Sequence, residues 1–202
     1  IIKNKPLEYK TFLNRIFSAL NIVLLPIVVG MFFMSDSMIL IAGGEQYIAG
    51  DAVLKVLSVA TLFAIYASLF TNCVLIVNRQ EKLCLKATVV SAIVNVGLNF
   101  VLMPTLGMIG AAVTTVIAEL VNCMMQMCFS KAFFDWRTLE VKPIVSCICG
   151  SAFIGITCLL CNGFFHNSLM KMACAVVLSA LVYVITLIVM RNPYATAAMD
   201  VI

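Results

Sequence analysis

The chain has 202 residues, of which 63% are hydrophobic and only 11% are charged. A soluble domain carries about 25% charged residues because water must solvate its surface, so this composition excludes an ordinary soluble protein. The net charge is +4. It comes from basic residues that flank apolar segments, so nucleic-acid binding is not expected.

Six apolar stretches divide the chain, and each is long enough to cross a bilayer. A hydrocarbon core of about 30 Å needs roughly 20 apolar residues in a helix, which pairs its own backbone amides. The sequence therefore predicts an all-α, polytopic transmembrane helical bundle with six spans. The predicted spans cover residues 16–34, 52–77, 83–103, 107–129, 143–161 and 169–190.

The basic residues predict the orientation of these spans. If all six cross, only Lys55 and Lys171 of the 13 Lys and Arg residues fall on the side opposite to the others. The first loop on that opposite side is acidic, with Asp36, Glu45 and Asp51. Because cytoplasmic loops carry an excess of Lys and Arg, both ends of this segment are predicted to lie in the cytoplasm.

The chain opens with Ile1 and shows no signal-sequence pattern, which favours the later part of a longer protein. All nine cysteines lie within or at the ends of apolar spans, where cysteine packs as a small hydrophobic side chain. Cys158 and Cys161 form a C-x-x-C pair, but no cysteine pair has flanking histidines at zinc-ligand spacing. Packing is favoured over redox or metal chemistry, and no cofactor or metal is predicted.

The first predicted span contains Pro26 and Gly30. Proline removes a backbone hydrogen bond and glycine admits a close neighbour, so this helix is expected to bend near its middle. The bend is either a tolerated kink or a hinge of a moving transporter, and the residues leave both readings open. Pro104 and Gly107, between the third and fourth spans, are the other hinge candidates.

The third and fourth spans carry most of the polar groups. Asn95 and Asn99 are four residues apart and lie on one helical face, as do Glu119, Asn122 and Gln126. A carboxylate within a span usually faces a bundle interior or a wet cavity, whereas asparagine also links helices by hydrogen bonds. These five residues are the candidates for a cavity, a substrate contact or ion coupling. For Glu119 a neutral structural acid is the alternative.

The run from Asn95 to Glu119, NVGLNFVLMPTLGMIGAAVTTVIAE, resembles the helix–loop–helix signature of the polysaccharide transporter family. These are the flippases of O-antigen, teichoic-acid and capsular repeat units, relatives of the lipid II flippase and of the multidrug and toxin extruders. The segment from Pro26 to Gly30 and the glycine-rich turn that begins at Gly43 also resemble the family. The resemblance covers about residues 12–130.

The resemblance implies two six-helix bundles related by pseudo-twofold symmetry. Residues 1–130 would supply four helices of the second bundle, and residues 131–202 a cytoplasmic loop and two additional helices. The implied function is translocation of undecaprenyl-pyrophosphate-linked oligosaccharide repeat units across the bacterial cytoplasmic membrane, for cell-surface polysaccharide synthesis. The implied partners are the lipid bilayer, this lipid-linked oligosaccharide, the N-terminal bundle of the same chain, and the polysaccharide polymerase and glycosyltransferases. Coupling to an H⁺ or Na⁺ gradient would fall to Glu119, while the family's basic cavity residues would lie largely outside this chain.

Three other classes compete with a flippase. A multidrug or metabolite extruder of the same superfamily would share the fold, and a non-transporting membrane scaffold would pack its polar faces dry. A membrane enzyme needs convergent acids, bases or metal ligands, which the sequence does not offer. His166 is expected in a solvated loop, and Asp135, Trp136, Arg137 and Glu140 are typical of an interfacial anchor.

Overall fold

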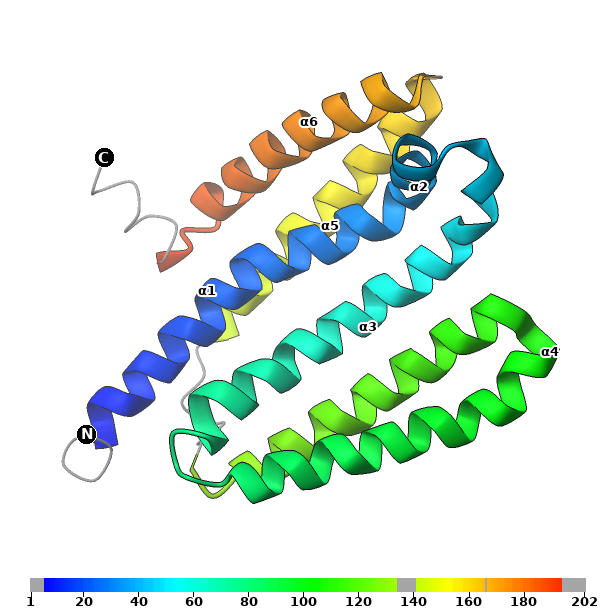
Figure 1. Ribbon diagram of the computed structural model, residues 1–202. Coiled ribbons are helices and arrows are strands. Elements are labelled where there is room, and N and C mark those ends of the chain that lie inside the picture. Colours follow the sequence, from blue (N-terminus) through cyan, green and yellow to red (C-terminus); the bar gives the residue numbers. More distant parts are fainter. Residues whose placement is uncertain (1–5, 134–140, 166, 194–202) are drawn as a thin grey trace. The chain divides into compact units, whose positions relative to one another are not determined.

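The computed structural model describes residues 6–133, 141–165 and 167–193, and these residues fold entirely as helices and connecting turns (Figure 1). The interfacial loop predicted at Asp135–Glu140 and His166 lie outside the described residues. The helices in chain order are α1 (Pro6–Phe33), α2 (Ser35–Gly43), the 3₁₀ helix η1 (Glu45–Gly50), α3 (Asp51–Phe70), the π-helix η2 (Thr71–Leu75), α4 (Glu81–Ser130), α5 (Val141–Phe164) and α6 (Ser168–Val189).

In the described part of the chain, five helical segments are long and apolar enough to cross a membrane. These results confirm the prediction of a polytopic, all-α membrane protein, because water-exposed helices of this length would not be apolar on every side. The segments are Thr11–Phe33, Glu45–Leu75, Glu81–Ser130, Val141–Phe164 and Ser168–Val189.

The third segment, α4, contains both the third and the fourth predicted spans. Its 50 residues would measure about 75 Å as a straight helix, which is more than twice the hydrocarbon thickness. The helical backbone breaks at Gly107, where φ is 58° and ψ is −134°, and the chain turns back on itself (Figure 1). We call residues 81–106 the first arm and residues 108–130 the second arm.

Hydrogen bonds between distant residues hold the two arms antiparallel. The Ser91 hydroxyl donates to the Ala118 carbonyl at 2.8 Å, and the Thr114 hydroxyl donates to the Asn99 Oδ1 at 3.0 Å. The sequence places the end of the third span at Met103–Pro104, but the helix continues through Pro104. Gly107 makes the turn instead, because its backbone conformation lies in a region that residues with a Cβ rarely adopt.

Two compact units emerge from the packing. One combines the described residues 6–14 and 56–133, and the other combines residues 15–55 with the described part of residues 140–202. In the first unit, the Tyr9 hydroxyl donates to the Cys73 carbonyl at 2.7 Å. These two units do not coincide with the predicted domains, which meet at residue 130. The predicted domains are parts of a transporter bundle, and that division stays a prediction.

The second unit has its own core, in which α5 and α6 pack together. Cys158 and Cys161 are free thiols buried in this core, an arrangement that supports packing for the C-x-x-C pair. The buried hydrophobic residues of this core are Met34, Cys147, Ile154, Cys158, Cys161, Ala175, Tyr183 and Leu187.

An ion pair joins α2 to α6 within this unit. The Lys171 Nζ lies 2.9 Å from the Asp36 Oδ2, and Lys171 is buried to 9% exposure. Burial by itself would raise the pKa of Asp36, but the hydrogen bond from Lys171 and those from Ser37 outweigh it and lower the pKa. The two residues were predicted on the same side of the membrane, which their contact supports.

Replacing Asp36 with asparagine is expected to destabilise the protein by roughly 2 kcal/mol, because the buried Lys171 ammonium loses its charged partner. Since the folded-state pKa of Asp36 lies below its unfolded value, the pair stabilises fully above about pH 4 and is lost as the pH falls through the folded value. The thermal unfolding midpoint in detergent, measured from pH 7 to pH 2 for wild type and Asp36→Asn, tests this. The difference between the two proteins should shrink only at the acid end.

The cation of the pair can be removed instead, by Lys171→Met. Its matched control is Lys55→Met, because Lys55 pairs with Asp51 at 2.8 Å in a more exposed i,i+4 arrangement. Such pairs contribute about 0.3–0.5 kcal/mol. Equal losses for Lys55→Met and Lys171→Met would contradict a special contribution of the Asp36 pair.

Candidate functional site

The five polar residues singled out in the sequence all lie on α4, and they form two groups. Asn95 and Asn99 belong to the first arm, and Glu119, Asn122 and Gln126 belong to the second. Among the described residues, no hydrogen bond joins one group to the other. The groups are therefore described separately.

The asparagines form a network that crosses the hairpin. The Asn99 Nδ2 donates to the Asn95 Oδ1 at 2.9 Å and to the Asn95 carbonyl at 3.0 Å, which places both side chains on one face as predicted. The Asn99 Oδ1 accepts from Thr114, whose side chain is completely buried. This role of Thr114 was not predicted from the sequence. The sequence offers one signal for it, because Thr114 follows Gly107 at about the same distance along the chain as Asn99 precedes it.

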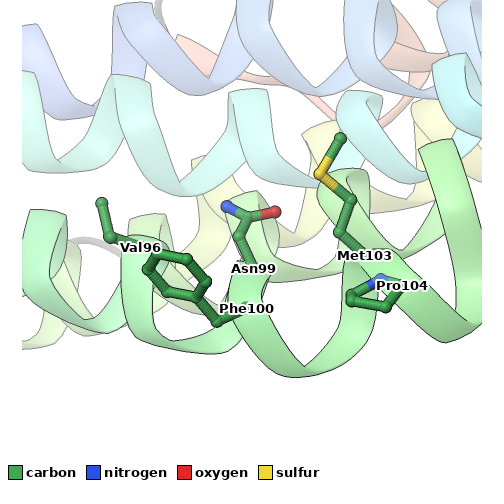
Figure 2. A pocket seen from close by; sticks show the side chains of 5 residues that line it. All are labelled: Val96, Asn99, Phe100, Met103 and Pro104. Atoms are coloured by element: carbon green, nitrogen blue, oxygen red, sulfur yellow. The ribbon is translucent and has the colours of Figure 1, made fainter.

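A hollow of about 420 Å³ adjoins Asn99 on the first arm (Figure 2). Asn99 contributes the only amide to the residues that line it, which are Val96, Asn99, Phe100, Met103 and Pro104. Because that amide already bonds to Asn95 and Thr114, it has little capacity left for a ligand. These contacts support a role for Asn95 and Asn99 as links within the hairpin.

The second group forms a polar stripe along the second arm. Successive residues of a helix are about 100° apart, so Glu119, Asn122, Gln126 and Ser130 fall within an arc of about 80°. Gln126 is 1% exposed and Ser130 is fully buried, whereas Glu119 and Asn122 are half-buried. We call these four residues the polar stripe.

Three oxygens of the polar stripe have no hydrogen-bond partner among the described residues. They are the Asn122 Oδ1, the Gln126 Oε1 and the Ser130 Oγ, and all three atoms are inaccessible to solvent. Buried polar atoms in native proteins are nearly always paired with protein or ordered water. The prediction did not include Ser130, although its spacing of four residues from Gln126 would have placed it on the same face.

The proline in α1 creates a special backbone position. Pro26 has no amide hydrogen, so the carbonyl four residues earlier, that of Ile22, loses its helical donor. The Tyr183 hydroxyl of α6 donates to this carbonyl at 2.8 Å. Pro26 and Gly30 also line an apolar groove of about 590 Å³ within the second unit. Whether Pro26 and Gly30 act as a hinge stays a prediction, as it does for Pro104 and Gly107.

Metal binding finds no support in the part of the chain that the structure describes. No group of three or more His, Cys, Asp or Glu side chains lies close enough there to hold a metal ion.

Comparison with known proteins gives a distant match to a transporter. The chain is 23% identical over 185 residues to the probable low-salt glycan biosynthesis flippase Agl15 of Haloferax volcanii, covering 90% of this chain and 38% of that protein. It is 24% identical over 137 residues to an uncharacterized membrane protein of Methanocaldococcus jannaschii, covering 68% of this chain and 27% of that protein. The chain thus spans less than two fifths of the length of either relative. No protein-family model and no solved structure matches it.

The chain is distantly similar to a flippase. That similarity supports a membrane-embedded part of a glycan-biosynthesis transporter and, weakly, a role other than catalysis. Both relatives are archaeal, and they lend no support to a specifically bacterial membrane or to O-antigen as the product.

Proposed function

We propose that this chain is part of a flippase that moves lipid-linked oligosaccharides across a membrane by alternating access. The observation that carries the proposal is the similarity to a glycan biosynthesis flippase over 90% of the chain. A sugar head group cannot cross hydrocarbon unaided, since each unpaired polar group there costs several kcal/mol. A polar path that opens to each side in turn removes this barrier while the lipid tail stays in the bilayer.

Within this proposal, each arm of α4 crosses the membrane, so the segment has six crossings and both of its ends lie in the cytoplasm. The length of each arm supports this assignment, because 23 to 26 helical residues measure about 35–39 Å. The undecaprenyl carrier and the bacterial membrane remain predictions from the family resemblance.

The two polar groups of α4 receive different roles. Asn95 and Asn99 hold the hairpin together, as their bonds to each other and to Thr114 support. Glu119 and Asn122, the half-buried residues of the polar stripe, face the path, and Glu119 couples transport to an ion gradient. A partly buried carboxylate in a membrane helix is costly, so its presence favours a function that uses its charge.

Replacing Glu119 with glutamine is expected to slow flipping by about tenfold or more, because the amide keeps the shape but cannot bind and release a proton. The test uses the native full-length protein in cells that lack their own copy. Transport is measured as the fraction of lipid-linked oligosaccharide that becomes accessible on the outer leaflet, at equal membrane levels of protein.

The control is Glu81→Gln at the exposed start of α4, which should leave the rate unchanged. Undiminished transport by Glu119→Gln would remove Glu119 from the mechanism. If loss of the protein changes drug or metabolite efflux but not the lipid-linked oligosaccharide, the flippase proposal itself is wrong.

A further inference from the structure

A pocket of about 500 Å³ lies in the second unit, where the end of α2 packs against the start of α6. We call it the α2–α6 pocket. Its walls are Leu40, Ile41, Gly44 and Glu45 on one side and residues 167–169 on the other. Sites for small molecules usually enclose about 300–1,000 Å³, so the pocket has room for a ligand. It shares no residue with the polar stripe or with the apolar groove of α1.

Three polar side chains of the α2–α6 pocket are free to bind a ligand. The Asn167 Oδ1 accepts from the Leu169 amide at 3.0 Å and so caps α6, while the Asn167 Nδ2 has no acceptor among the described residues. In the same part of the chain, the Glu45 carboxylate and the Ser168 hydroxyl have no hydrogen-bond or ion-pair partner. The pocket therefore offers a donor, an acceptor and a hydroxyl that can act as either.

An ion pair holds the two walls of the pocket together. Asp36 lies one helical turn, about 6 Å, before Leu40 in α2. Lys171 lies one turn after Asn167 in α6, and its amide donates to the Asn167 carbonyl at 2.8 Å. The Asp36–Lys171 pair therefore links α2 to α6 one turn beneath the pocket. Walls that are fixed before a ligand arrives lower the entropic cost of binding it.

The charge of the α2–α6 pocket disfavours ions as its ligand. Glu45 is its one carboxylate, and its lining contains no Lys or Arg, so a phosphate or pyrophosphate group would be repelled. A calcium ion takes about six to eight oxygen ligands, more than one carboxylate, one amide and one hydroxyl supply. The ligand class that fits is a neutral molecule that carries hydroxyl groups.

The apolar part of the lining narrows this class to sugars. Leu40, Ile41 and Leu169 form apolar walls beside the polar groups. Ligand pockets commonly combine such walls with a few polar groups that fix the orientation of the ligand. A sugar ring has hydroxyl groups at its edge and C–H groups on its faces, so it matches both parts of the lining.

We infer that the α2–α6 pocket binds one sugar residue of the oligosaccharide head group on the non-cytoplasmic side of the membrane. The inference rests on the proposed function, in which six crossings place the end of α2 and the start of α6 on that side. Glu45 accepts from one sugar hydroxyl and the Asn167 amide donates to another. A sugar held there has completed its crossing, so the pocket slows its return. The pyrophosphate binds elsewhere in the protein.

Binding can be measured without any transport assay. The probe is the cell's own oligosaccharide, released from its lipid pyrophosphate by mild acid, and the protein is the full-length chain in lipid nanodiscs. Saturation-transfer NMR, in which magnetisation passes from the protein to bound sugar protons, reports the contact. We expect a clear signal for wild type and a several-fold weaker one for the double variant Glu45→Gln, Asn167→Asp.

The two substitutions change the hydrogen bonds of the pocket and leave its fold in place. Glutamine keeps the shape of Glu45, and aspartate at residue 167 still caps α6 through an oxygen but loses the amide donor. Equal thermal unfolding midpoints of wild type and double variant check this. The control is Gln46→Ala, because Gln46 is exposed beside Glu45 and does not line the pocket. It should leave the sugar signal unchanged.

Three results would overturn the sugar site: no signal with wild type, equal signals from wild type and double variant, or a loss in Gln46→Ala as large as in the double variant. A wild-type signal that inorganic pyrophosphate abolishes would also overturn it, because the pocket would then bind anions. Flipping that depends on the protein, without sugar binding in the pocket, overturns the site alone. Sugar binding that the double variant loses, with flipping that does not need the protein, overturns the flippase proposal and keeps the site.

Discussion

Replacing Gly110 with alanine is expected to destabilise the protein by about 3 kcal/mol, because the two arms of α4 meet at this residue without room for a methyl group. A Cβ at Gly110 would lie 2.5 Å from the Leu102 carbonyl oxygen and 2.8 Å from its carbon. Both are backbone atoms, so the arms must separate, and overpacking of this kind costs about 1–3 kcal/mol or more. The thermal unfolding midpoint in detergent measures the loss.

Two other glycines of α4 separate this steric effect from the conformational preference of glycine. A Cβ at Gly97 meets nothing within 4 Å, so Gly97→Ala should stabilise the helix by about 0.5–1 kcal/mol. Gly107 also has open space but a φ of +58°, so Gly107→Ala should cost about 1–2 kcal/mol through backbone strain. If Gly110→Ala lowers the thermal unfolding midpoint no more than Gly107→Ala does, the close contact of the arms is not what stabilises the hairpin.

Separation of the arms should also break the bond from Thr114 to Asn99, which lies one turn further along the second arm. Gly110→Ala is therefore expected to lower flipping as well as stability. Thr114→Val, which removes the hydroxyl and keeps the shape, should lower the unfolding midpoint by less, since a hydrogen bond between membrane helices contributes about 0.6 kcal/mol on average.

Replacing Tyr183 with phenylalanine is expected to cost about 1–2 kcal/mol, because the Ile22 carbonyl loses its donor. The hydroxyl lies 2.8 Å from that carbonyl, and Pro26 cannot replace it. An unpaired buried carbonyl costs about 1–3 kcal/mol. For Tyr183→Phe we expect a cost toward the lower end of this range, because a hydrogen bond between membrane helices contributes only about 0.6 kcal/mol on average.

In a Pro26→Ala background, Tyr183→Phe should change the free energy of unfolding very little. Alanine restores an amide hydrogen at residue 26, which bonds to the Ile22 carbonyl as in an ordinary helix. The double-mutant cycle on Tyr183 and Pro26, followed by thermal unfolding in detergent, should give an interaction energy of about 1 kcal/mol. A cost of Tyr183→Phe that is identical in both backgrounds would show that the hydroxyl stabilises something other than the proline-opened backbone.

Gly150 offers an independent test of the same contact. A Cβ at Gly150 would lie 2.7 Å from two ring carbons of Tyr183, so Gly150→Ala should displace the ring and the hydroxyl together. Its cost should exceed that of Tyr183→Phe, because packing is lost along with the hydrogen bond.

Several features could be predicted from local sequence because they depend on neighbours in the chain. The length of the apolar runs indicates membrane helices, since only a helix or a closed barrel satisfies its backbone in hydrocarbon. The pairing of Asn95 with Asn99 follows from the helical repeat. The predicted end of the third span at Pro104 was wrong, because membrane helices tolerate a proline when other groups satisfy the freed backbone.

The sequence by itself determined that the chain is apolar, helical and membrane-spanning, and that Asn95, Asn99, Glu119, Asn122 and Gln126 lie within apolar spans, because these properties follow from composition and the 3.6-residue repeat. Only the tertiary structure decided which groups pair. Thr114 with Asn99, Tyr183 with Ile22 and Lys171 with Asp36 are 15, 161 and 135 residues apart. No local pattern encodes such pairs, since they depend on how the helices pack. The same packing buries Gln126 and leaves its oxygen without a protein partner.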